Sequence, residues 1–129
     1  MKAVKNVVSA AITPADKAFM QTTIQALSNK MPFLISLTNE ERMSGVKLGE
    51  KTLPFVEKVL EYAKDNPLLV PGTVDMIEAN KDYLLSKDLT DILQWLKPLV
   101  QKMEDTCMEA GIEGTAGCTC FLSISKECR

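Results

Sequence analysis

The residues best suited to chemistry are the four cysteines, Cys107, Cys118, Cys120 and Cys128. Four thiolates suffice to bind zinc or an iron–sulfur cluster. They contain no Cys-x-x-Cys pair, and on one continuous helix Cys118 and Cys120 point about 200° apart, while Cys107 and Cys118 lie about 16 Å apart along the axis. A shared metal site therefore requires residues 111–128 to be non-helical. Buried or idle thiols are the favoured interpretation, ahead of a metal or redox site and of regulated disulfides.

The chain has no histidine. This excludes Ser-His-Asp and Cys-His catalysis, histidine-ligated metal sites and the usual pH switch near neutrality. The sequence also contains no Walker loop, dinucleotide fingerprint or nucleophile elbow. We therefore assign no catalytic, cofactor-binding or metal-ligating residue and expect no cofactor. The sequence leans away from an enzyme without telling what the protein does.

Three further groups of side chains could have either a structural or a functional role. The acidic residues Asp105, Glu109 and Glu113 line one helix face, either as a solvated surface or to meet a cation or a basic partner. Trp95 lies one position off the main apolar stripe, as the edge of a core or as an anchor for a partner. Six methionines beside the initiator fill gaps in a core or form an adaptable binding groove: Met20, Met31, Met43, Met76, Met103 and Met108.

Charge and composition argue against several partners. The net charge is −2, with 9 basic and 6 acidic residues in 1–64 and 6 and 11 in 65–129. This balance, with only 5% aromatic residues, predicts no nucleic-acid binding. No run of about 18 apolar residues would span a membrane, and the N-terminal residues do not resemble a signal peptide. We expect a cytoplasmic location with reduced cysteines.

The elements predicted from this pattern are helical. Thr13-Pro14-Ala15-Asp16 is typical of a helix start, with the helix running to about Lys30. Residues 3–12 fit one helical face or a short arm. Thr38-Asn39-Glu40-Glu41 resembles a capping box before a short helix. A further helix is predicted over about 50–64, because Pro54 is tolerated only in a first turn.

The strongest pattern is an apolar stripe at helical spacing near the C-terminal half. A helix beginning near Thr73 is expected to bury Val74, Ile77 and Leu84, and Pro98 to kink or break the segment one turn upstream. Gly111, Gly114 and Gly117 lower helix propensity by about 1 kcal/mol each. We therefore expect helix through about Met108 and a less ordered tail over 114–129, the alternative being a small-residue face for a close helix. The stripe comprises Leu85, Leu89, Ile92, Leu93, Leu96, Leu99, Val100, Met103 and Cys107.

These elements predict an all-α fold: a four- to five-helix antiparallel bundle with short connections. The 129 residues would form a single helical domain, 1–129, which buries about two-thirds of its surface.

Several short segments between residues 12 and 113 carry a resemblance. They include Ile12-Thr13-Pro14-Ala15-Asp16, Pro32-Phe33-Leu34 with Leu37, Glu41-Arg42, Leu48-Gly49-Glu50-Lys51, Phe55-Val56-Glu57-Lys58, Asn66-Pro67, Val70-Pro71, Glu104-Asp105-Thr106 and Ala110-Gly111. Together they resemble a family of uncharacterised bacterial all-helical proteins over residues 12–113. After residue 113 the family continues into a longer Ala- and Tyr-rich helix, where this chain has Thr115-Ala116-Gly117-Cys118-Thr119-Cys120. The resemblance implies a helical bundle in a bacterial, cytoplasmic setting and no known activity.

Three functions remain open. The first is a small helical interaction or scaffolding module that binds a protein partner or itself, because the pattern is strongly amphipathic and lacks a catalytic set. The second is a bundle that holds a small apolar ligand between its helices. The third is a thiol-based metal or redox protein that uses Cys118, Cys120 and Cys128, with or without Cys107.

Overall fold

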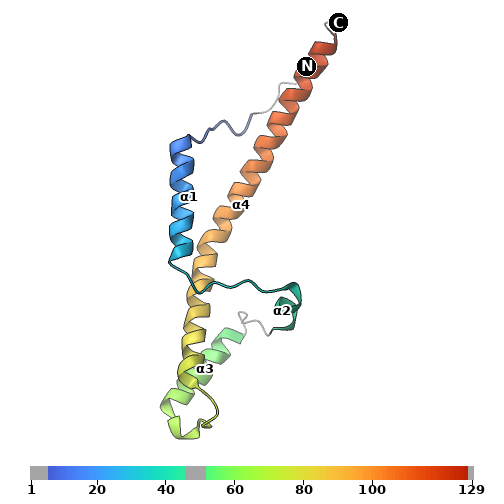
Figure 1. Ribbon diagram of the computed structural model, residues 1–129. Helices are drawn as coiled ribbons and strands as arrows, with labels where there is room; N and C mark the ends of the chain where they lie inside the picture. The colour runs from blue at the N-terminus through green and yellow to red at the C-terminus, as the bar shows by residue number, and fades with distance from the viewer. Residues whose placement is uncertain (1–5, 46–51, 128–129) are drawn as a thin grey trace. The chain divides into compact units, whose positions relative to one another are not determined.

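The computed structural model describes residues 6–45 and 52–127. Of these residues 78% are helical and none is in a strand, which confirms the all-α prediction. Figure 1 shows the elements in chain order: α1 (Pro14–Asn29), α2 (Asn39–Ser44), α3 (Thr52–Asp65), the short 3₁₀ helix η1 (Pro67–Leu69) and α4 (Met76–Glu127).

Contacts divide the chain into two parts, which we describe separately. The hairpin part is Leu37–Lys97, and the terminal part joins the residues up to Ser36 with those from Pro98 onward. Helix α4 contributes Met76–Lys97 to the hairpin part and the rest of its length to the terminal part.

The terminal part opens with an arm and then α1. Residues 6–12 have no helical structure, which favours the arm interpretation over that range. Helix α1 begins as predicted, because Thr13 Oγ1 accepts a hydrogen bond of 3.1 Å from the Asp16 amide and Pro14 occupies the first turn. A threonine cap satisfies an amide that otherwise lacks a partner, and Pro14 has no N–H to satisfy.

The hairpin part begins with the predicted capping box. Thr38 Oγ1 accepts from the Glu41 amide at 3.2 Å, and the Glu41 carboxylate accepts from the Thr38 amide at 2.9 Å. These reciprocal bonds start the short helix α2. In α3, Pro54 lies in the first turn as predicted; the expected start at Glu50 and Lys51 lies outside the described residues.

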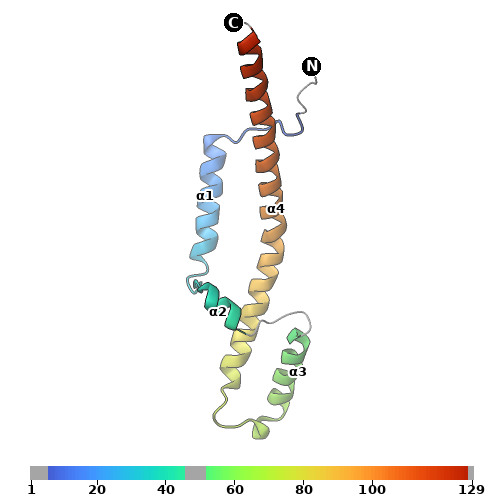
Figure 2. The same ribbon diagram turned by 90° about the vertical axis from the view of Figure 1, so that its right-hand side faces the viewer.

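Helix α4 begins at Met76 and not at Thr73 as expected. Asp75 acts as its cap, because Asp75 Oδ1 accepts from the amides of Ile77 at 3.1 Å and Glu78 at 3.0 Å. Helices α3 and α4 run in opposite directions, joined through η1 (Figures 1 and 2). This hairpin is an antiparallel neighbour pair of the kind that the sequence predicts.

Two predictions for α4 concern Pro98 and the C-terminal tail. The expected break at Pro98 is wrong, because the helix is continuous across it, and the alternative, a kink one turn upstream, stays a prediction. Proline removes only one backbone hydrogen bond, and helix-forming residues flank it on both sides. The expectation of a less ordered tail is wrong as well, because the helix continues as far as Glu127. The added cost of Gly111, Gly114 and Gly117 is small against propagation from a long existing helix, in which each further residue adds a hydrogen bond.

Burial within the described residues is far lower than expected from chain length. Tyr83 is the single described residue that is buried, with 7% of its surface exposed. Every described residue of α1 is exposed. The apolar stripe forms on one helix as predicted, but the expectation that its side chains are sequestered within the chain is wrong for more than half of them. The four- to five-helix bundle is not confirmed.

Candidate functional site

The cysteines are placed by α4. Cys107 and Cys118 are exposed, Cys120 is half-buried, and all three are free thiols. Because residues 111–127 are helical, Cys118 and Cys120 point about 200° apart and are unable to bind one ion together. No group of three metal-ligating side chains occurs in the ranges 6–45 and 52–127. Cys128 lies outside the described residues.

One residue of the acidic face on α4, Glu113, contacts the N-terminal arm. Glu113 is half-buried, and its carboxylate accepts hydrogen bonds from the amides of Val7 and Val8, the latter at 3.3 Å. Asp105 accepts from the Gln101 side chain at 3.0 Å. The Glu113 carboxylate is therefore occupied by the arm, and it is neither simply solvated nor available as it stands for a cation. The sequence pattern did not predict this contact with the arm.

Trp95 and the methionines do not form a core. Trp95 is 74% exposed, and Met20, Met43, Met103 and Met108 are also exposed. Met31 and Met76 are half-buried. The interpretation of Trp95 as the edge of a core within the chain is therefore wrong, and its indole is accessible to a partner.

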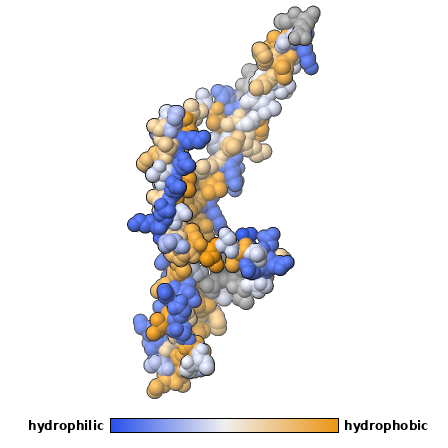
Figure 3. Space-filling model, viewed as in Figure 1, coloured by the Kyte–Doolittle hydropathy of each residue, from blue (hydrophilic) through white to orange (hydrophobic). Residues whose placement is uncertain are grey.

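Much of the apolar stripe of α4 is uncovered in the described structure. Leu89, Ile92 and Leu96 are half-buried. The other stripe residues on either side of them are exposed, including Leu99 at 54% and Met103 at 59%. Hydrophobic side chains are also at the surface of α1 and of the C-terminal turns of α4 in Figure 3.

The stripe and the hairpin use different sides of α4. Met76, Asn80 and Tyr83 line hollows that they share with α3. At 100° per residue, Leu96 and Met103 lie about 140° and 160° around the helix from Tyr83. In the hairpin part the hollows shared with α3 therefore lie on one side of α4, and the stripe follows the opposite side.

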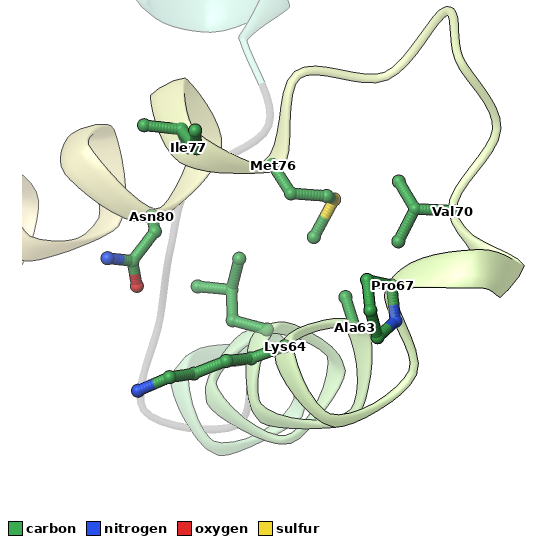
Figure 4. A pocket seen from close by; sticks show the side chains of 8 residues that line it. Ala63, Lys64, Pro67, Val70, Met76, Ile77 and Asn80 are labelled. Atoms are coloured by element: carbon green, nitrogen blue, oxygen red, sulfur yellow. The ribbon is translucent and has the colours of Figure 1, made fainter.

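The hairpin contains a hollow of about 480 Å³ between α3, η1 and the start of α4. Figure 4 shows Pro67, Val70 and Met76 gathered at one end, with Lys64 and Asn80 at the other. Leu60, Ala63 and Ile77 complete an apolar lining. A cation and an amide at one end of an apolar hollow would suit a molecule with an apolar chain and an anionic head.

Tyr83 lines a second hollow that shares Leu60, Lys64 and Asn80 with the first. The Tyr83 hydroxyl is buried and has no hydrogen-bond partner, although a buried hydroxyl normally has one. Sequence reasoning missed Tyr83 because it selected the apolar side chains Val74, Ile77 and Leu84. The expectation that these three are buried is wrong, because all of them are exposed.

Comparison with known proteins adds no assignment. No family model, curated protein or solved structure matches the chain. Among the described residues, no helix combines the length and the apolar character needed to cross a membrane. The two features with a geometry that could serve a function are the apolar stripe of α4 and the hairpin hollow.

Proposed function

We propose that the protein is a small helical interaction module that associates with a second copy of itself through the apolar stripe of α4. The exposure of stripe residues such as Leu99 and Met103 carries this proposal. Two copies would supply the helices of the four- to five-helix antiparallel bundle that one chain does not close. A contiguous exposed apolar surface is uncommon on a protein that acts alone.

The length of the stripe suits such a contact. From Leu85 to Met103 it extends about 27 Å along the helix, at about 1.5 Å per residue. Fully burying a leucine stabilises an association by about 1.5–3 kcal/mol relative to leaving it in water. A two-fold pair would cover both copies with one type of contact and close without further addition.

A charge placed in the stripe tests the proposal. Leu99→Glu should weaken association by about 3 kcal/mol or more, because the change removes apolar burial and desolvates a carboxylate. Gln94→Glu adds the same charge on the opposite side of α4, where Gln94 is exposed, and should leave association unchanged. Light scattering behind size-exclusion chromatography would measure the molar mass of each variant.

Equal masses for the unmodified chain and both variants would contradict the proposal. Circular dichroism is the control for folding, because Leu99 is exposed in the single chain and its substitution should preserve helical content. A protein partner other than a second copy would show as a monomeric chain whose capture of that partner is lost in Leu99→Glu alone.

The setting of this module is part of the proposal. A reducing cytoplasm is consistent with the free thiols of Cys107, Cys118 and Cys120. The bacterial origin continues to rest on the sequence resemblance.

The hairpin hollow supports a second candidate function, binding of a small amphiphile such as a fatty carboxylate. Its volume of about 480 Å³ falls in the range of about 300–1,000 Å³ typical of ligand sites. The Lys64 ammonium would face the head group and the Met76 end the chain. In the described part of the molecule, the one ion pair is Lys58 with Glu61 at 3.4 Å, so Lys64 has no such carboxylate partner there.

Calorimetry with decanoate and decanol would test the second candidate. The chain should bind decanoate more tightly, and Lys64→Met should abolish this preference. Lys87→Met is the matched control within the hairpin part, because Lys87 is exposed and lines neither hollow. Equal affinity for the two probes, or an equal effect of the two lysine changes, would contradict the assignment.

A further inference from the structure

We infer that the two α4 helices pair antiparallel, about a two-fold axis that crosses between them at the level of residues 94 and 95. This inference rests on the proposed self-association and specifies its geometry. It follows from the order of residues along α4. Apolar residues lie at equal distances before and after residue 94, and the charged residues beside them are placed in nearly the same symmetric way. The partner is a second copy of the chain.

The apolar layers are the first half of the argument. Six stripe residues alternate at spacings of four and three, which is the spacing of the core positions of a coiled coil. They are symmetric about residue 94, so each meets an apolar residue of the other copy when the helices are antiparallel. The pairs are Leu85 with Met103, Leu89 with Leu99, and Ile92 with Leu96.

The layers end where the symmetry would place polar residues. The next pair outward is Asp82 with Thr106. The apolar contact is thus limited to the same segment in both copies. If one helix were shifted along the other, apolar residues at one end would face polar residues of the second copy. Such alignments would therefore be less stable than the symmetric one.

The flanking charges are the second half of the argument. One row of residues beside the core contains Lys81, Asp88, Trp95, Lys102 and Glu109, at intervals of seven. In an antiparallel pair this row faces itself with its direction reversed. Asp88 then meets Lys102 of the second copy, and Lys81 meets Glu109, so every charged pair is attractive.

A parallel pair gives no such match. Each of these charged residues would then face the position five residues further along the other copy. Those positions hold Ser86, Leu93, Cys107 and Gly114. Charges on this row would therefore face no opposite charge, and the pattern discriminates between the two orientations.

The charged row beside the core is open for pairing. Lys81, Asp88 and Lys102 are exposed, and none of them forms an ion pair within the ranges 6–45 and 52–127. Trp95, at the centre of the row, is exposed. Pro98 lies about 160° around the helix from the middle of the stripe, so its ring is outside the contact.

Charge reversal tests the orientation. Asp88→Lys alone, or Lys102→Asp alone, should raise the dissociation constant about tenfold, because each places two like-charge pairs across the two-fold axis. The double variant restores both pairs and should return within about threefold of the unmodified chain. Sedimentation equilibrium at low salt would measure the constants, and high salt should reduce all differences.

Non-additivity in this cycle reports contact between copies. Within one helix Asp88 and Lys102 are fourteen residues apart, or about 21 Å along the axis, which is too far for a direct ion pair. Lys87→Asp is the matched control for Lys102→Asp, because Lys87 is exposed and lies about 180° around α4 from the middle of the stripe. It should change the constant less than threefold.

The outcomes separate this inference from the proposed function. Association with additive effects of the two reversals would overturn the antiparallel pairing and leave self-association intact. A chain that stays monomeric in every variant would overturn both. Rescue of the dissociation constant in the double variant alone would support the antiparallel pair.

Discussion

Trp95 shows how a single side chain separates a closed fold from an interaction surface. The sequence placed it one position off the stripe, where it would be either the edge of a core or an anchor. With 74% of its surface exposed, it makes little contribution to packing within the chain. Tryptophan at an interface commonly supplies a large share of the binding free energy, so its contribution should appear on association.

Trp95→Ala should weaken self-association by about 2 kcal/mol and leave the thermal stability of the dissociated chain almost unchanged. Because the chain has a single tryptophan, fluorescence of the unmodified protein gives a second readout. Its emission should shift to shorter wavelength as concentration rises and the indole leaves water. A substitution that unfolds the dilute monomer would contradict this account of Trp95.

Glu113 is the other residue whose role the structure specifies. Glu113→Ala removes the acceptors for the Val7 and Val8 amides, so hydrogen exchange at residues 7 and 8 should accelerate. The effect on the free energy of unfolding should stay below about 1 kcal/mol, because the site is partly solvated. Glu109→Ala, one turn earlier, is the control. Equal exchange in the two variants would refute the anchoring role.

At the scale of elements, local signals predicted the starts of α1 and α2 but not the end of α4. Thr13 and Thr38 mark starts because a cap is a local hydrogen bond. The end of α4 was predicted too early because only the low helix propensity of its glycines was considered. The long helix that precedes them, from which helical structure propagates, was not. Tyr83 was missed because its burial depends on α3, a contact that no local pattern contains. The hollow beside it was unpredictable for the same reason.

The three glycines of α4 offer a direct test. A methyl group added at Gly111, Gly114 or Gly117 would meet no atom within 4 Å. Gly114→Ala should therefore stabilise the helix by about 0.5–1 kcal/mol and raise the unfolding midpoint by about 2–5 °C. Circular dichroism at 222 nm would measure both helicity and midpoint. A lower midpoint would indicate that a helix approaches this face closely, as in the small-residue alternative.

At the scale of the whole molecule, the sequence predicts a closed bundle, whereas much of the apolar stripe is exposed in the single chain. The apolar residues of α4 are sufficient for a bundle, but α3 lies next to the side of α4 that carries Tyr83 and not next to the side that carries the stripe. An amphipathic period predicts that a face will be covered and does not say by which chain. The bundle prediction assumed the same chain, and the exposure of Leu99 and Met103 does not support that assumption.

The molar mass of the unmodified chain tests this account most directly. Sedimentation equilibrium over a range of concentrations should show reversible association, from the chain mass of 14.2 kDa towards twice that value. The rise should level off at two chains, because a two-fold contact is closed. A mass that stays at one chain at every concentration would contradict the claim that a second copy covers the α4 stripe.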